Sequence, residues 1–303
     1  MRNVITIARK ELNTYFQSPI AYILIAAFAA MFGYFFWSLV YFFVRASMQA
    51  QMSGRAMPMN LNELVVRNLL GNCGVLCLFM IPMLSMRLFA EEKARGTIEL
   101  LLTSPLKDWE ILLGKWIGAV GMYASLLLFS SINLVFLFAY GKPDWKPLLI
   151  GYLGLLLQAA AMLALGMFIS SVTQNQIVAA VMTFFLLLLL WVFEWMANMD
   201  QNRITEVLTY ISLLRHNESF IKGVLDMKDT IYYLIVSFLG RARTFFPVPV
   251  SDVDVLGQTF DNLRGLFRKT VALVGRRVES LVVLVSQVIG DTENGDNYEN
   301  VES

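Results

Sequence analysis

The stretch PLLIGYLGLLLQAAAMLALGMFISSVTQNQIVAAVMTFFLLLLLWVF runs from Pro147 to Phe193 and contains no Asp, Glu, Lys or Arg over 47 residues. A helix that spans a bilayer needs roughly 20 mostly apolar residues, so this stretch is long enough for two. Its polar interruption, Ser170–Gln176, has the composition of a tight turn. The sequence therefore predicts two spans here, Leu148–Ile169 and Ile177–Ala197.

Three more charge-free runs lie N-terminal to this stretch. They predict spans at Ile20–Val44, Asn68–Met86 and Trp116–Gly141, which makes five. A sixth run, Thr230–Gly240, is only 11 residues long and is followed by Arg241 and Arg243. It can form a span only if the apolar stretch 245–250 joins it and the arginines snorkel or face protein. The predicted fold is an all-α polytopic transmembrane helical bundle with five spans and an uncertain sixth.

The composition agrees with a membrane protein. Of the 303 residues, 57% are hydrophobic and 16% are charged, and the mean hydropathy is +0.60. Soluble domains have about 45–50% apolar and about 25% charged residues. The net charge of +1 argues against nucleic-acid binding. Two cysteines and one histidine are too few for a disulfide framework, a four-ligand zinc site or multi-histidine chemistry.

The distribution of Lys and Arg predicts a cytoplasmic N-terminus. Three basic residues precede the first span, and five more crowd the connection between the second and third spans. The opposite side carries nine, spread over a much longer stretch. The segment Ile5–Tyr15 mixes apolar and charged residues and is expected to form a helix along the inner interface.

The connection Arg87–Lys115 is the most informative part of the chain. The second span can continue as a helix into the cytoplasm, with Glu91 and Arg95 paired at i,i+4. Gly96 then permits a sharp reversal, and Thr97 is suited to cap a following short helix whose first turn contains Glu99. Ile98, Leu101 and Leu102 share one face of that helix. Pro105 should end it and suits the first position of the next helix, whose beginning Asp108 and Glu110 mark.

Two interpretations of this connection stay open on physical grounds alone. It is either a solvated loop with a structural turn, or a knob that docks into a partner protein through its apolar triplet and its acidic residues.

The strings FAEEK at Phe89–Lys93 and GTIELLLTSP at Gly96–Pro105 closely resemble the signature of type-2 ABC transporter permeases. These are the exporter-type membrane subunits of multidrug, polysaccharide and gliding-motility-associated systems. A second match, in the loop after the fifth span, is similar to the stretch that these permeases carry before their sixth span. Its residues include Ser212, His216, Phe220, Gly223 and Asp226. The resemblance covers about residues 1–240.

The resemblance implies six spans, an N-terminal interfacial helix and a coupling helix between the second and third spans. It also implies a dimer of permeases in the inner membrane, homo- or heteromeric, with two ATP-hydrolysing subunits beneath. Carried over residue by residue, the coupling helix would contain Gly96, Thr97, Ile98, Glu99, Leu101 and Leu102. Glu91, Glu92 and Arg95 would form its approach.

The chain lacks a phosphate-binding loop, because Gly114-Lys115 is followed by Trp116 and no glycine stands five residues before Gly114. ATP and magnesium are therefore expected on a separate ATP-binding subunit, with no catalytic residue, cofactor or metal in this chain. The predicted function is the permease subunit of an ATP-driven exporter, in contact with membrane lipid. The alternative is a non-transporting membrane anchor or force-transmitting component of a motility or export machine. A membrane-embedded enzyme is disfavoured because the five span interiors contain no ionisable Asp, Glu, His, Lys or Arg.

Residues 241–303 depart from the family pattern and are treated as an atypical tail. Apolar residues at spacings of three and four predict an amphipathic helix over about 259–289. The acidic end after it, residues 291–303, is expected to be disordered.

Three smaller groups keep two interpretations each. Cys73 and Cys77 are a metal pair or, more in keeping with their place in a span, small residues that allow close helix packing. His216 either forms a functional site together with Glu218, or it has a surface or loop-packing role. Asn133 and Gln158, in mid-span, line a pathway or hold helices together.

Overall fold

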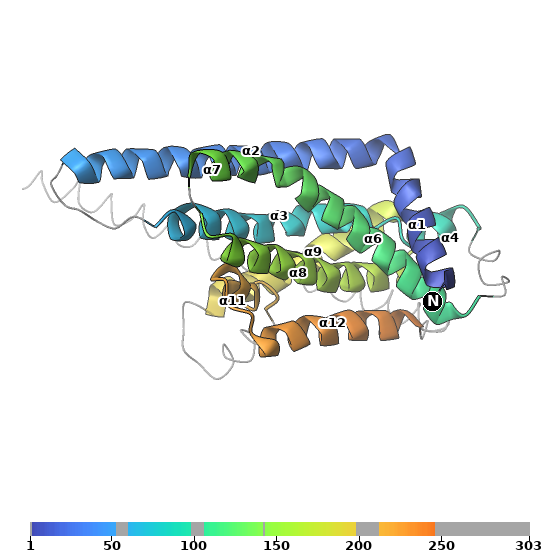
Figure 1. Ribbon diagram of the computed structural model, residues 1–303. Helices are drawn as coiled ribbons and strands as arrows, with labels where there is room; N and C mark the ends of the chain where they lie inside the picture. The colour runs from blue at the N-terminus through green and yellow to red at the C-terminus, as the bar shows by residue number, and fades with distance from the viewer. Residues whose placement is uncertain (1, 53–59, 98–105, 142, 198–211, 246–303) are drawn as a thin grey trace, which may run out of the picture. The chain divides into compact units, whose positions relative to one another are not determined.

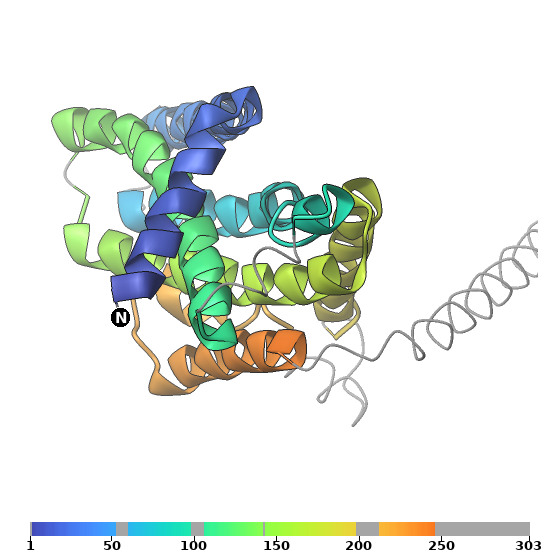
Figure 2. The ribbon, with the colours of Figure 1, turned by 90° about the vertical axis from the view of Figure 1, so that its right-hand side faces the viewer.

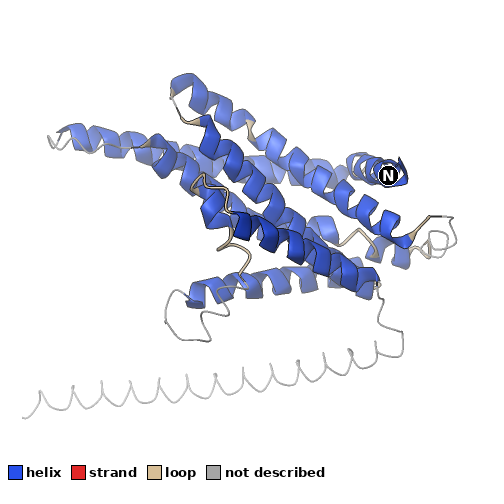
Figure 3. Cartoon of the chain, turned by 60° about the horizontal axis from the view of Figure 1, so that its bottom comes forward, coloured by secondary structure: helices blue, strands red, loops and turns tan. Residues whose placement is uncertain are grey.

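The computed structural model describes residues 2–52, 60–97, 106–141, 143–197 and 212–245. Within these ranges the regular elements are helices, with no strand among them (Figure 3). In chain order they are α1 (Arg2–Gln17), α2 (Pro19–Met52), η1 (Asn62–Val66), α3 (Arg67–Ser85), α4 (Ala90–Ala94), α6 (Asp108–Ser130), α7 (Ile132–Tyr140), α8 (Trp145–Val172), α9 (Gln176–Ala197), α11 (Asn217–Ile221) and α12 (Met227–Phe245) (Figure 1).

Five segments of the described chain are long and apolar enough to cross a membrane. They are Pro19–Met52, Asn62–Ala94, Asp108–Tyr140, Trp145–Val172 and Gln176–Phe193. Each contains or overlaps one of the five predicted spans, so the prediction of an all-α polytopic helical bundle is confirmed. The turn expected at Ser170–Gln176 is also present, since α8 ends at Val172 and α9 begins at Gln176.

Helix α1 is longer than the helix expected at Ile5–Tyr15, and it ends at a bend before the first span. The carbonyl of Ser18 accepts the N–H of Ala21 at 3.1 Å, and Pro19 begins α2, a position where its missing N–H costs nothing. The 34 residues of α2 measure about 50 Å, more than the hydrocarbon thickness of about 30 Å. The predicted span Ile20–Val44 is therefore the apolar part of a helix that extends beyond the hydrocarbon layer.

The helix of the second span is interrupted before α4, so the unbroken continuation that the sequence allows is not formed. Helix α3 ends at Ser85 and the chain turns before α4 begins at Ala90. The hydroxyl of Ser170, at the end of α8, accepts the N–H groups of Phe89 at 3.1 Å and Ala90 at 3.0 Å. This hydroxyl satisfies two donors that an unbroken helix would have bonded internally, so the break depends on a residue 80 positions away.

The third span has two parts. Helix α6 begins at Asp108, as the acidic residues indicated, and Pro105 lies outside the described residues. The carboxylate of Glu110 accepts the N–H of Lys107 at 3.4 Å and helps to cap this end. The two parts meet at Ser131, where α6 ends and α7 begins.

Helix α12 is a sixth long helix, although its ends carry too many charged residues for it to count among the five candidate spans. It packs along α8 and also contacts α6. A Cβ atom at Gly240 would come within 2.8 Å of the backbone of Ala164, which shows how closely α12 approaches α8. The guanidinium of Arg241 lies 4.2 Å from the centroid of the Trp116 ring, so this arginine faces protein, one of the two alternatives expected for it.

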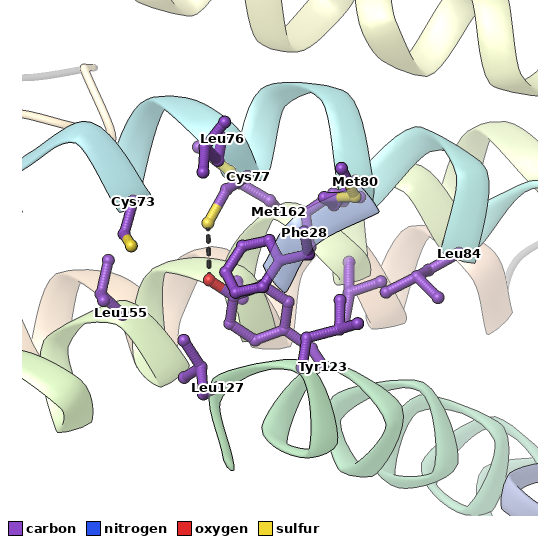
Figure 4. Packing of buried hydrophobic residues seen from close by; sticks show 14 of the residues in the cluster. Phe28, Cys73, Leu76, Cys77, Met80, Leu84, Tyr123, Leu127, Leu155 and Met162 are labelled. Atoms are coloured by element: carbon purple, nitrogen blue, oxygen red, sulfur yellow. Dashed lines mark hydrogen bonds between the residues drawn. The ribbon is translucent and has the colours of Figure 1, made fainter. Parts of the chain in front are cut away.

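The buried core lies around Tyr123 of α6 (Figure 4). Its hydroxyl is 2.9 Å from the sulfur of Cys77, and the ring of Phe28 packs edge-on against it at a centroid distance of 6.4 Å. Cys73 and Cys77 are both free and buried. Their positions agree with the interpretation of two small residues that allow α3 to pack closely.

The chain divides into two units, Met1–Pro247 and Val248–Ser303. The helix predicted over about 259–289 and the acidic end that follows it lie outside the described residues.

Candidate functional site at the junction of α1, α4 and α6

The N-terminus of α1, helix α4 and the beginning of α6 lie at one end of the bundle, at the right of Figure 1. The segment singled out in the sequence, Glu91–Leu102, starts in α4 and leads towards α6. We call the contacts among these three helices the α1–α4–α6 junction.

Lys115 is the centre of this junction. Its side chain is 2% exposed, and its ammonium group lies 2.5 Å from Glu11 Oε1 of α1 and 2.7 Å from Glu92 Oε1 of α4. The ammonium also lies 5.4 Å from the centroid of the Phe89 ring. One buried cation therefore joins carboxylates from two other helices.

Glycines bring α1 against α6 at the same place. A Cβ atom at Gly114 would lie 2.6 Å from the Cβ of Ile7, and one at Gly118 would lie 2.6 Å from the Cβ of Glu11. Contacts this close need residues without a side chain. Figure 2 shows α1 crossing in front of α6 at this end of the bundle.

A second set of contacts fixes the corner between α1 and α2. The Tyr15 hydroxyl donates to the carbonyl of Leu84 at 2.8 Å, and Arg87 Nη1 donates to Ser18 Oγ at 3.0 Å. Burial, followed by the negative charge of Glu11, raises the pKa of the Tyr15 phenol well above its ordinary value. Tyr15 therefore stays neutral in the folded protein and keeps its hydrogen bond.

Helix α4 is held on its other sides as well. Glu91 pairs with Arg95 at 2.5 Å, which confirms the predicted i,i+4 pair, and with Arg87 at 4.0 Å. Lys93 donates from Nζ to the carbonyl of Ser171 at the end of α8. Together with the bond from Ser170, this fixes α4 to α8.

The reversal predicted at Gly96 is present. Gly96 has φ = 70°, its N–H donates to the carbonyl of Lys93 at 3.1 Å, and the N–H of Thr97 donates to that of Glu92 at 3.0 Å. This pair of bonds is the Schellman motif that ends a helix. Thr97 takes part in ending α4, and its predicted role as a cap of the next helix concerns residues outside those described. Ile98, Glu99, Leu101 and Leu102 also lie outside the described residues.

The second family-like motif, in the loop after the fifth span, is built into the opposite end of the bundle rather than standing on its surface. Ser212, His216 and Phe220 are buried. His216 Nδ1 lies 2.7 Å from Asp229 Oδ1, and its ring stacks on Tyr232 at 3.9 Å.

The pairing of His216 with Glu218 is not seen. Glu218 instead contacts Lys222 at 3.3 Å. The loop-packing interpretation of His216 is thus favoured over a site formed with Glu218.

The remaining motif residues shape the chain around this loop. Gly223 has φ = 78°, and a Cβ atom there would come within 2.7 Å of Pro147. The Asp226 carboxylate accepts the N–H of Lys228 at 3.0 Å and so caps α12.

A buried amide chain links this loop to the spans. Asn217 Nδ2 donates to Gln158 Oε1 at 2.7 Å, and Gln158 Nε2 donates to the carbonyl of Gly74 at 3.1 Å. Gln158 therefore holds helices together. Asn133, the other mid-span amide, donates only weakly within its own segment, to the Ser130 carbonyl at 3.4 Å.

Sequence reasoning missed Lys115 and Glu11 as parts of the junction, and it missed Ser170 as the residue that fixes α4 to α8. A signal was present for the first: a lysine between glycines, Gly114-Lys115-Trp116-Ile117-Gly118, at the edge of an apolar run. A lysine is almost never fully buried unless it is paired. A lysine beside close-packing glycines therefore indicates a carboxylate partner. Its partners, however, come from segments that only the fold brings together.

The comparison with known families agrees with this architecture. The family model described as "ABC-2 family transporter protein" matches residues 5–239, from α1 to the last turns of α12. No curated protein matches the sequence closely enough to serve as a named relative. Since the match covers more than half of the chain, this multi-pass membrane protein belongs to the ABC-2 family of transporter proteins and is a type-2 ABC transporter permease.

Proposed function

We propose that the chain is the membrane subunit of an ATP-driven exporter whose ATP is bound and hydrolysed, with magnesium, by a separate ABC subunit. Two permease copies, identical or different, would form the transport route through the inner membrane, in contact with lipid. The N-terminus and the connection between α4 and α6 would face the cytoplasm. The permease family implies the association with an ATP-binding subunit.

The observation that carries this proposal is the α1–α4–α6 junction. The connection that follows α4 leaves from a helix anchored to α6 through Lys115 and to α8 through Ser170 and Lys93. A push on the segment Thr97–Thr103 would therefore be transmitted to two spans instead of being absorbed by a loose loop. This is the mechanical requirement for a coupling helix.

The arrangement of the ends supports the proposed orientation. The N-terminus of α1 and the beginning of α6 lie at the same end of the bundle as α4 (Figure 1). The dense group of basic residues, with three before the first span and five between the second and third, thus belongs to one side. Excess Lys and Arg favours the cytoplasmic side.

The test is to purify the tagged chain from its own membrane together with any ATP-binding subunit that it retains. The complex is reconstituted in phosphatidylethanolamine–phosphatidylglycerol vesicles, and ATP turnover is measured with and without the permease. Glu99→Lys and Leu101→Asp should abolish the stimulated turnover. Glu63→Lys is the matched charge reversal, because Glu63 is exposed on η1 and lies outside the junction.

Wild-type turnover in both coupling-segment variants would contradict the proposal. Accumulation of amphipathic compounds inside inverted vesicles separates an exporter from the alternative of a non-transporting, force-transmitting component. Stimulated ATP turnover without accumulation of any cargo would favour that alternative.

A further inference from the structure

Lys115 is a costly residue to place where it is. Its side chain is 2% exposed, yet it carries a charge that water would otherwise solvate. A buried ion pair often contributes little net stability, because desolvation offsets the attraction between the charges. The stability of the bundle alone is therefore a poor reason for a lysine at this position.

The geometry shows what the lysine does connect. Glu11 Oε1 lies 2.5 Å from the ammonium and Glu92 Oε1 lies 2.7 Å from it. The first carboxylate belongs to α1, the second to α4, and the lysine to α6. Each of these helices therefore contributes one charge to a shared cluster.

The cluster carries two carboxylates for one ammonium. The second oxygen of Glu92 is buried and has no hydrogen-bond partner among the described residues. Without the lysine, two partly exposed carboxylates would face each other with no positive charge between them. Removing the lysine is therefore unfavourable, because the two carboxylates would repel each other without a counter-charge.

Helix α1 is positioned to depend on this contact. It lies on Gly114 and Gly118, the glycine before the lysine and the glycine three residues after it. A second polar contact, from Asn3 Nδ2 to Glu110 Oε2 at 3.2 Å, lies nearer the start of both helices. The two helices are thus in register from their first turns, with the ion pair at the end nearest the bilayer-spanning part of α6.

We propose that Lys115 is a positioning residue that makes α1 move together with α4 and α6 when the ATP-binding subunit acts on the permease. On this view the element driven by ATP is the whole α1–α4–α6 junction, and not only the connection between α4 and α6. Helix α1 continues through Ser18 into the first span, so its movement would reach a third spanning helix. The inference rests on the proposed function and deepens it.

The experiment uses the reconstituted complex of the full chain with its ATP-binding subunit and compares four variants with the wild type. These are Lys115→Met, Lys115→Glu, Glu11→Gln, and the charge swap Glu11→Lys with Lys115→Glu. The amount of ATP-binding subunit retained, the stimulated ATP turnover and the midpoint of thermal unfolding are measured for each. Lys10→Met is the control, since Lys10 is the exposed neighbour of Glu11 on α1.

We expect the three single variants to retain the ATP-binding subunit while stimulated turnover falls by about tenfold, within the usual range of coupling free energies. The charge swap should recover part of the loss of Lys115→Glu, because it restores the attraction between positions 11 and 115 while Glu92 still faces a carboxylate at position 115. A residue with only a structural role would lower the unfolding midpoint and the retained subunit together, and the swap would not restore turnover selectively. If Lys115→Met does not accumulate in the membrane, the Glu11→Gln variant tests the inference instead, because it keeps the pair between Lys115 and Glu92.

Two outcomes would overturn the inference. In the first, the Lys115→Met and Glu11→Gln variants stimulate ATP turnover as strongly as the wild type does. In the other, the swap is as defective as Lys115→Glu although it is folded and bound. A wild-type chain that neither retains an ATP-binding subunit nor stimulates its turnover would instead overturn the proposed function, and this inference with it.

Discussion

The hydroxyl of Ser170 lies 3.0 Å from the amide nitrogen of Ala90 and accepts its hydrogen. The same oxygen accepts the N–H of Phe89 at 3.1 Å and donates to the carbonyl of Met86 at 3.3 Å. One side chain at the end of α8 therefore satisfies the turn between α3 and α4. The direction in which α4 leaves the second span depends on it.

Replacing Ser170 with Ala should destabilise the protein by about 1–3 kcal/mol, because two buried N–H groups lose their acceptor. The midpoint of thermal unfolding in detergent measures the effect. Ser171→Ala is the control: among the described residues, the Ser171 hydroxyl bonds to the Phe168 carbonyl of its own helix and to no other helix. That variant should stay within about 0.5 kcal/mol of the wild type. Equal effects in the two variants would show that the Ser170 contacts are unimportant.

Gly118→Ala should separate α1 from α6, because the added methyl group would lie 2.6 Å from the Cβ of Glu11. Overpacking of this kind costs about 1–3 kcal/mol. Gly121→Ala, one turn along the same helix, meets only the Leu12 side chain at 3.6 Å. It should be neutral or stabilising, since Ala is the better helix former. Thermal unfolding of the two variants in parallel tests the difference in their stabilities. An equal loss of stability in Gly121→Ala would contradict this explanation.

Gln158→Leu should loosen the loop after the fifth span, which contains Asn217. The Gly74 carbonyl and the Asn217 amide would both lose their hydrogen-bond partner in the buried interior. We expect a cost of about 1–3 kcal/mol for each group left unsatisfied. Faster limited proteolysis of the exposed turn Val224–Met227 would report the loosening. Asn133→Leu is the matched control, since that amide makes only a weak bond of 3.4 Å within its own segment. Proteolysis at the wild-type rate in Gln158→Leu would exclude a holding role.

Tyr15→Phe should reveal the pH dependence of the corner between α1 and α2. The folded state raises the pKa of the Tyr15 phenol above the ordinary value of 10.0, chiefly through burial. The contribution of Tyr15 to stability is therefore complete below pH 10 and is lost as the pH rises above it.

Below that pH the wild type should exceed Tyr15→Phe by about 1 kcal/mol, the worth of one hydrogen bond. The difference should shrink between about pH 10 and about pH 11 in thermal unfolding experiments. A difference that does not change over this range would show that the phenol is not held neutral by the fold.

Much of the fold was predictable because the bilayer imposes simple requirements. Runs such as Pro147–Phe193 are long enough for helices and contain no charge, and Ser170–Gln176 has the polar composition that ends them. Gly96 was predictable as a reversal because few other residues tolerate a positive φ. The Glu91–Arg95 pair followed from helical spacing alone. Each of these features is local in the chain.

The errors and omissions share the opposite property. The break between α3 and α4 was missed because its acceptor, Ser170, is supplied by another span. The end of the sixth helix was uncertain because the place of Arg241 depends on Trp116, a residue of α6. His216 could not be assigned to Asp229 instead of Glu218 from spacing, since both carboxylates are near it in sequence.

The amino-acid sequence was sufficient to show that this chain crosses a membrane, where most of its helices lie, and which segment carries the permease signature. Hydrophobic length and local backbone preference are sufficient for that, because each acts over neighbouring residues. The meeting of Glu11 and Glu92 at the buried Lys115 became visible in the folded chain alone. Such a cluster forms when three helices from separate parts of the chain are packed closely enough to exclude water, and no local pattern encodes which charges will meet there.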